Sequence, residues 1–162
     1  MSTSIPAGFT TLTPMLVLKD ARKAIDFYQR AFGAEERYVM PGPDGRGVMH
    51  AEIRIGNSIL MFGEENPQQA CKSAESFGGS PVSFYLYFDD VDAAFARALK
   101  AGGEALMPVT EMFWGDRIGT LQDPFGYTWT VATQVKELTD EEVRAGAQAF
   151  FAAMAKESAC GN

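Results

Sequence analysis

The sequence predicts an α+β fold made of two tandem βαβββ units and one additional C-terminal helix. The segment 16–34, LVLKDARKAIDFYQRAFGA, has a counterpart at 86–104, LYFDDVDAAFARALKAGGE, at a constant offset. Each copy consists of a short apolar strand, an acidic helix cap, an amphipathic helix and a terminating glycine. Strand-like segments follow each helix. A duplicated unit therefore organises the chain.

The first unit is expected to occupy residues 1–64. Asp20 precedes an amphipathic segment, so its carboxylate can cap the free amides of the first helical turn, and Gly33 can end the helix in a left-handed conformation. Residues 48–55 alternate in a strand pattern that places His50, Glu52 and Arg54 on one face. The predicted elements are a strand at 13–18, a helix at 21–32, and strands at 34–40, 48–55 and 58–62.

The second unit is expected at 82–134, after a polar linker at 65–81 that is rich in Gly, Ser, Asn and Gln. Asp90 is the predicted helix cap, and Gly102 and Gly103 end that helix. The turn sequence DPFG at 123–126 separates the last two strands. The predicted elements are a strand at 82–88, a helix at 91–101, a strand at 105–110, a bend at 114–116 followed by a strand to 122, and a strand at 127–133.

The segment 135–162 is predicted to hold a third helix, at 139–156, that has no counterpart in the first half. Thr139 and Glu142 form a capping-box pattern. The helix has one apolar stripe, which must be buried against either its own domain or a second subunit. The stripe consists of Val143, Ala147, Phe150, Phe151 and Met154.

Composition excludes several functional classes. The net charge is −7 and the pI is about 4.7, which disfavours binding to nucleic acid or to anionic membrane surfaces. No apolar run approaches the roughly 18–20 residues of a membrane helix. The N-terminus lacks a signal-peptide pattern. We expect Cys71 and Cys160 to be reduced thiols in a cytoplasmic protein, rather than a disulfide.

Four motifs together resemble the vicinal oxygen chelate superfamily, which includes glyoxalase I, extradiol dioxygenases, and fosfomycin and bleomycin resistance proteins. The strongest likeness is to its PhnB-like glyoxalase/bleomycin-resistance branch, and it covers residues 11–134. The resemblance implies two curved mixed sheets with helices on the convex side, a ligand cavity and a homodimer. The motifs are AIDFYQRAFGAEE (24–36), MHAEIRIGNSILMF (49–62), FWGDR (113–117) and DPFGYTW (123–129).

The resemblance also locates the positions at which metal-dependent members carry His, Gln or Glu ligands. In this chain those positions hold Thr13, Met61, Ser83 and Thr130, none of which is a competent ligand for zinc, nickel or iron. The chain has a single histidine, His50, so it cannot supply a two-histidine iron site. We therefore predict no metal and no cofactor, which argues against a glyoxalase or dioxygenase reaction.

A cavity lined by aromatic side chains and a few polar groups suits a planar organic ligand. His50 and Glu52 are the candidate catalytic pair, because a histidine beside a carboxylate can act as a general base near neutral pH. The candidate ligand-binding residues are Arg54, Tyr85, Tyr87, Phe113, Trp114, Arg117, Thr120 and Trp129.

Structural roles are open for several of these residues. Trp129 and Tyr85 could belong to the core. His50 and Glu52 could form only a hydrogen-bonded pair, and Arg54 and Arg117 could simply pair with Glu52 and Asp116.

We expect a metal-free, homodimeric protein that sequesters a small aromatic or amphipathic ligand. The alternatives are a lyase or isomerase that uses His50 and Glu52 or an unconventional divalent metal site, and a structural or regulatory module without a ligand.

Overall fold

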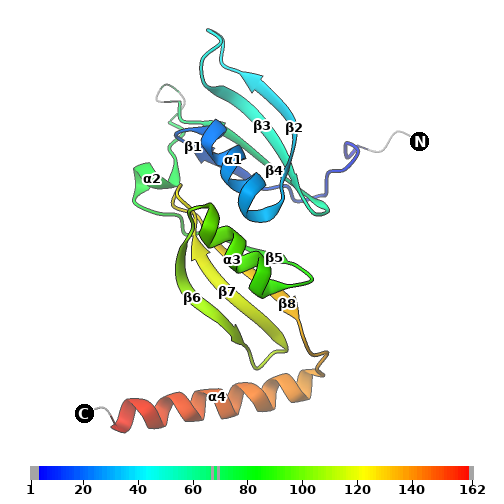
Figure 1. Ribbon diagram of the computed structural model, residues 1–162, viewed down its shortest axis with the longest axis vertical. Coiled ribbons are helices and arrows are strands. Elements are labelled where there is room, and N and C mark those ends of the chain that lie inside the picture. Colours follow the sequence, from blue (N-terminus) through cyan, green and yellow to red (C-terminus); the bar gives the residue numbers. More distant parts are fainter. Residues whose placement is uncertain (1–3, 67, 69, 161–162) are drawn as a thin grey trace.

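The computed structural model describes residues 4–66, 68 and 70–160, with the backbone alone for 157–160. It contains two four-stranded mixed sheets, each with a helix packed on one side, followed by a long C-terminal helix (Figure 1). The predicted fold class is confirmed. Parts of the predicted segments 1–64, 65–81 and 135–162 lie outside the described residues.

The first module has the strand order β1-β4-β3-β2, which we call sheet 1. Strand β1 is parallel to β4, with Met15 opposite Met61, and the other neighbours are antiparallel. Strand β1 begins at Met15 rather than at 13, because Pro14 has no N–H to donate to a sheet. The elements are β1 (Met15–Leu18), α1 (Ala21–Phe32), β2 (Glu35–Pro41), β3 (Val48–Ile55) and β4 (Ser58–Glu64).

The second module repeats this topology as sheet 2, with the order β5-β8-β7-β6. Tyr85 lies opposite Thr130 in the parallel pair β5–β8, as Met15 lies opposite Met61 in sheet 1. The sequence repeat is therefore also a repeat of strand register. The elements are β5 (Ser83–Tyr87), α3 (Val91–Ala101), β6 (Glu104–Glu111), β7 (Asp116–Gln122) and β8 (Thr128–Gln134).

Both predicted helix caps are present. The Asp20 carboxylate accepts a hydrogen bond from the backbone N–H of Lys23 at 3.0 Å, and Asp90 accepts one from Ala93 at 2.9 Å. Gly33, with φ of 69°, ends α1 in the left-handed conformation. These caps fix where each helix begins over its sheet.

The two modules share one core on their helix-covered sides. Helices α1 and α3 lie side by side in the middle of the molecule (Figure 1). The rings of Tyr28 and Phe32 in α1 lie 5.3 and 5.0 Å from the ring of Trp129 in β8. The hydroxyl of Tyr28 donates to the buried carboxylate of Asp123 at 2.8 Å. Side chains of the first module therefore complete the core of the second.

The predicted linker contains a short helix that the sequence did not reveal, α2 (Ala74–Phe77). Its N-cap, Ser73, is fully buried, and its backbone N–H donates to the Glu65 carboxylate at 2.7 Å. The Ser73 hydroxyl donates to the same oxygen at 2.5 Å. The linker is thus anchored at Glu65 by hydrogen bonds rather than by an apolar pattern, which explains why periodicity did not indicate it.

The anchor at Glu65 predicts a stability that depends on acidic pH. Hydrogen bonds from Ser73 lower the pKa of Glu65 from 4.5 to about 2. Because the folded-state pKa is depressed, the contribution of this carboxylate is complete above about pH 4.5 and is lost as the pH falls towards 2. We expect Glu65→Gln to be less stable than the wild type at pH 7, with the difference shrinking below pH 4.5. Thermal unfolding from pH 7 to 2.5 measures it; a constant difference would contradict the assignment.

Helix α4 (Asp140–Cys160) runs across the end of sheet 2 (Figure 1). Its predicted capping box is present, since Glu142 accepts from the Thr139 backbone N–H at 2.8 Å and donates its own N–H to the Thr139 hydroxyl. In its first turns Val143, Gly146 and Ala147 are half-buried, and Gly146 lies against Phe113. Residues 148–156 are exposed, with Phe151 61% exposed, so the apolar stripe is only partly covered by its own chain.

Candidate functional site

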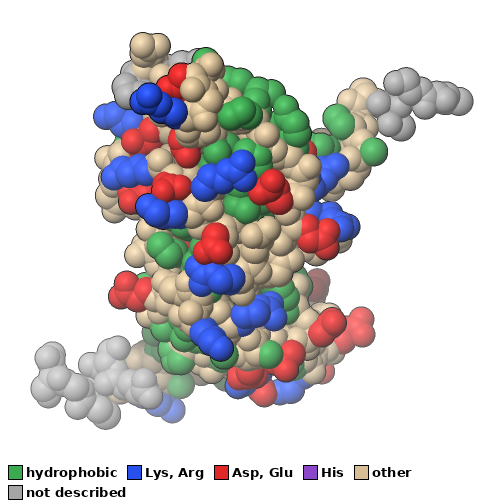
Figure 2. Space-filling model, turned by 45° about the horizontal axis from the view of Figure 1, so that its top comes forward, with side chains coloured by type: hydrophobic (Ala, Val, Ile, Leu, Met, Phe, Trp, Pro, Cys, Tyr) green, Lys and Arg blue, Asp and Glu red, His purple; other side chains and the backbone are tan. Residues whose placement is uncertain are grey.

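The helix-covered side of the molecule is an ordinary solvated surface. Acidic and basic side chains are interspersed over the face seen in Figure 2. On α1, Arg30 pairs with Asp26 at 2.7 Å, and Arg22 pairs with Glu36 at 3.2 Å. Such exposed pairs contribute little to stability. The face of each sheet opposite its helix is called its open face.

Alternation along β3 defines the open face of sheet 1. Ala51 and Ile53 are fully buried under α1, whereas His50 and Glu52 are only partly buried and point the other way. This arrangement agrees with the face predicted from the sequence. The Nε2 atom of His50 lies 3.3 Å from Oε1 of Glu52, so the candidate pair is in contact.

Two residues that the sequence analysis missed complete this group on sheet 1. The guanidinium of Arg37 lies 3.6 Å from the carboxylate of Glu52, and the ring of Tyr38 lies 6.3 Å from that of His50. A shift in the β2–β3 register between Glu36 and Tyr38 accompanies this placement. The register shift cannot be read from the alternation of either strand, so Arg37 gave no signal in the sequence.

The ion-pair partners suggested for the two candidate arginines were wrong. Arg54 pairs with Glu35, the residue opposite it on β2. Arg117 forms two hydrogen bonds with Asp92 in the first turn of α3, at 2.9 and 2.8 Å. Adjacent residues of a strand point to opposite faces, so Arg117 lies on the helix-covered side while Asp116 lies on the open face. Arg117 is therefore removed from the candidate site.

Asp116, the first residue of β7, is a shared hydrogen-bond acceptor on the open face of sheet 2. Its Oδ2 atom accepts hydrogen bonds from the hydroxyls of Tyr85 and Tyr87, at 3.0 and 2.9 Å, and from Nε1 of Trp114 at 3.2 Å. The carboxylate is 6% exposed, whereas the two tyrosines are 44% and 64% exposed. One buried acceptor thus fixes three aromatic side chains that remain accessible. We call these four residues the Asp116 cluster.

The electrostatics of the Asp116 cluster keep both phenols neutral. Burial, together with the hydrogen bond to Asp116, raises the pKa of Tyr85 to about 12. The hydrogen bond to Asp116 is the main cause that raises the pKa of Tyr87. Arg117 is the only basic residue in β5, β7 and β8, and it faces away. The cluster therefore offers aromatic surface and one negative charge, with no cation to attract an anionic ligand.

The remaining candidates divide between the open face and the core. The hydroxyl oxygens of Thr120 and Thr130 lie 3.2 Å apart on adjacent strands beside the Asp116 cluster. Trp129 is not on this face: it is 1% exposed, and its Nε1 donates to Asp123 at 2.8 Å. Phe113 is turned towards α4, with its ring 5.5 Å from that of Phe150. Of the two side chains that could have belonged to the core, Trp129 therefore does and Tyr85 does not.

In this chain, the side chains at the positions where metal-dependent relatives bind an ion are not suited to binding a metal. Three of them carry hydroxyls and Met61 carries a thioether, a donor set unsuited to zinc, nickel or iron. Two of the hydroxyls are engaged, Thr13 as donor to the carbonyl of Thr10 and Thr130 with Thr120. Within the described part of the chain, no three His, Cys, Asp or Glu side chains gather as a metal site. We derive no chemistry through a metal.

No helix in the described ranges is long and apolar enough to cross a membrane.

Comparison with known proteins agrees with this fold. The chain is 42% identical over 137 residues to Rv0887c of Mycobacterium tuberculosis, a match covering 83% of this chain and 80% of that protein. The crystal structure of the Arabidopsis thaliana At5g48480 product, 32% identical, superposes with a TM-score of 0.63 over 76% of this chain and 98% of that one. A PhnB protein from Bacillus cereus, 19% identical, shares the fold, with a TM-score of 0.60 over 76% of this chain and 99% of its own.

The family model that matches describes the Glyoxalase/Bleomycin resistance protein/Dioxygenase superfamily, and it spans residues 11–131, which include all of sheet 1 and sheet 2 as far as the middle of β8. Helix α4 lies beyond the matched region. The duplicated modules, their shared strand register and the family match together place this chain in the glyoxalase/bleomycin resistance protein/dioxygenase superfamily.

Proposed function

We propose that the chain binds a small planar molecule, neutral or cationic, against the open face of sheet 2. The observation that supports this is the Asp116 cluster: Tyr85, Tyr87 and Trp114 are held by one carboxylate while both tyrosine rings stay accessible. Aromatic side chains that are fixed before binding lose little conformational entropy when a ligand stacks on them. The lack of a basic residue on this face selects against anions.

A second copy of the chain completes the cavity in this proposal. Met15 and Tyr38 on sheet 1 are 60% and 46% exposed, and apolar area of this kind is usually covered in a partner contact. The helix-covered sides of both modules are already used in their shared core, so the open faces remain for a partner. Sheet 1 of one copy then faces sheet 2 of the other, and the His50–Glu52 pair forms the opposite wall.

Light scattering tests the dimer. We expect a molar mass of twice the 17.6 kDa chain at micromolar concentration. A mass of one chain under these conditions would contradict the shared cavity.

Removal of Tyr87, the most exposed ring of the Asp116 cluster, tests the ligand site. We expect Tyr87→Ala to weaken the binding of thioflavin T, a planar cation, by about tenfold or more, because stacking on an aromatic side chain contributes about 0.5–1.5 kcal/mol beyond the area that it buries. The measurement is a fluorescence titration of the dye. Phe77→Ala, which removes an exposed aromatic side chain on α2, is the matched control and should bind as the wild type does. Equal affinities for Tyr87→Ala and the wild type would contradict the assignment.

A lyase or isomerase reaction at His50 is the second candidate, supported by the 3.3 Å contact between His50 and Glu52. In this reading the imidazole removes a proton from a bound substrate, and Glu52 orients it, as expected for general-base catalysis. We expect any turnover of dicarbonyl–glutathione adducts to fall by about 100-fold or more in His50→Ala. Turnover that survives this change would exclude His50 as the base.

A further inference from the structure

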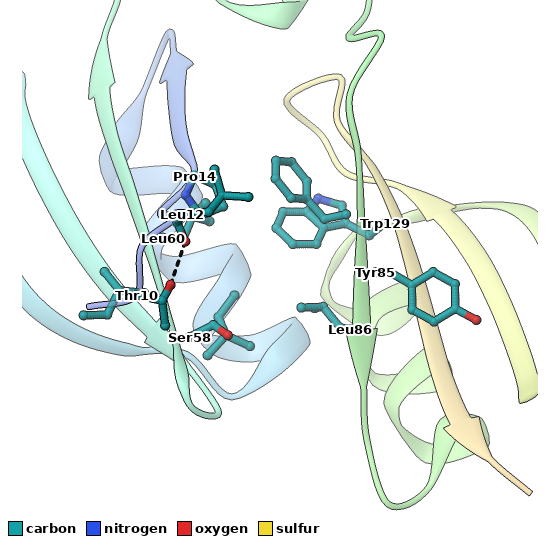
Figure 3. Close-up of a pocket in the computed structure, with 11 residues that line it drawn as sticks. Thr10, Leu12, Pro14, Ser58, Leu60, Tyr85, Leu86 and Trp129 are labelled. Atoms are coloured by element: carbon teal, nitrogen blue, oxygen red, sulfur yellow. Dashed lines mark hydrogen bonds between the residues drawn. The ribbon is translucent and has the colours of Figure 1, made fainter. Parts of the chain in front are cut away.

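An apolar cavity of about 220 Å³ lies between the two modules (Figure 3), and Tyr85 is the one residue of the Asp116 cluster that lines it. Leu12, Pro14 and Leu60 line it from the first module. Phe84, Leu86 and Trp129 line it from the second. Figure 3 shows these two groups facing one another across the gap, with the hydroxyl of Tyr85 pointing away from it.

The wall supplied by sheet 2 is flat and aromatic. The rings of Phe84 and Trp129 are stacked, with centroids 4.6 Å apart and an angle of 30° between their planes. The indole N–H of Trp129 is already donated to Asp123, and the hydroxyl of Tyr85 to Asp116. Trp129 is only 1% exposed, so the half-buried Phe84 supplies the accessible aromatic surface, and neither Trp129 nor Tyr85 offers a free donor to the cavity.

The polar groups of the cavity are few and uncharged. No Asp, Glu, Lys, Arg or His is among the residues that line it, and the hydroxyls are those of Thr10 and Ser58. The hydroxyl of Thr10 donates to the carbonyl of Leu12 at 2.6 Å, as the dashed line in Figure 3 shows. A charged ligand would lose its hydration here without gaining a partner, which is strongly unfavourable.

The size of the cavity limits the ligand. A dry apolar cavity of about 150 Å³ accepts benzene, so this somewhat larger one has room for one substituted ring or two fused rings. We propose that this cavity is a second binding site, for a small uncharged aromatic molecule that stacks on Phe84 beside Trp129. The cavity shares Tyr85 with the Asp116 cluster, but the proposed site needs neither the Asp116 carboxylate nor a partner chain.

Trp129 makes the proposal directly measurable. The chain has two tryptophans, so the background variant Trp114→Phe leaves Trp129 as the sole indole fluorophore. The probe is 4-iodophenol, which is neutral at pH 7 and whose iodine quenches an indole in contact. We expect saturable quenching of Trp129, and at least tenfold weaker quenching by 4-iodobenzoate, an anion of similar size.

Two filling variants test the location in the same background. Leu60→Phe enlarges the wall from the first module and Leu86→Phe enlarges it from the second, so one can replace the other if it does not fold. Each is expected to weaken saturable quenching at least tenfold. Leu106→Phe, at an exposed position of β6, makes the same change of side chain outside the cavity and should leave quenching unchanged.

The outcomes also separate this site from the proposed open-face site. Tyr87→Ala should keep the quenching of Trp129 by 4-iodophenol although it loses thioflavin T binding. Quenching that stays linear in probe concentration, or that is equal in Leu60→Phe, Leu86→Phe and their parent, would overturn the proposal.

Discussion

Asp123→Ala is expected to lower the free energy of unfolding by about 3–5 kcal/mol, the largest effect of any single substitution proposed for this chain. The carboxylate accepts four hydrogen bonds. Two come from side chains, Tyr28 and Trp129, each at 2.8 Å, and two come from the backbone N–H groups of Phe125 and Tyr127, each at 2.9 Å. Leaving a buried donor without a partner costs about 1–3 kcal/mol, and the alanine leaves four, but removal of the buried carboxylate, whose desolvation is unfavourable, offsets part of this cost.

The position of Asp123 explains why its loss should affect the whole chain. Burial raises the pKa of this carboxyl, while its four hydrogen bonds act in the opposite direction. Tyr28 belongs to α1, whereas Asp123 and Trp129 belong to the second module, so the network joins the two halves. Loss of the acceptor therefore loosens the packing of one module on the other as well as the turn before β8.

Chemical denaturation of Asp123→Ala, Asp123→Asn and Tyr28→Phe measures this contribution. Asparagine retains one carbonyl acceptor, and phenylalanine removes a single donor, so both should cost less than alanine. A loss below about 1 kcal/mol in the alanine variant would show that the network contributes little, because that is the range of an ordinary hydrogen bond.

Asp116→Ala is expected to weaken thioflavin T binding by about tenfold or more. The substitution removes the acceptor shared by Tyr85, Tyr87 and Trp114, so these side chains regain rotamer freedom that a ligand must then restrict. It also removes the single negative charge of the cluster. A tenfold change corresponds to about 1.4 kcal/mol.

Asp116→Asn separates the two causes. The amide oxygen can still accept hydrogen bonds but carries no charge, so an affinity between those of the wild type and the alanine variant indicates that both contribute. Dye affinities that are the same in all three proteins would contradict a role of Asp116 in binding.

The fold could be predicted because its signals are local and occur twice. Asp20 and Asp90 cap equivalent helices, and the alternation in β3 correctly placed His50 and Glu52 on one face. The short helix α2 was missed because a hydrogen bond to Glu65, rather than an apolar pattern, fixes its start.

The site was harder to predict because its pairs depend on strand register and on which face a helix covers. Trp129 lies opposite Phe84, and Thr130 opposite Tyr85, so the β5–β8 register sends Trp129 to the core and leaves Tyr85 outside. Arg54 meets Glu35 for the same reason, through the pairing of β2 with β3. Neither pairing can be read from a single strand of the sequence.

The two tryptophans offer the most direct test of the proposed open-face site. Their indole N–H groups give separate signals in a ¹⁵N–¹H correlation spectrum, one from Trp114 bonded to Asp116 and the other from Trp129 bonded to Asp123. During a titration with thioflavin T, we predict that the Trp114 indole signal shifts saturably while the Trp129 signal stays in place. A spectrum in which the Trp114 signal does not move, or in which only the Trp129 signal moves, would contradict ligand binding at the Asp116 cluster.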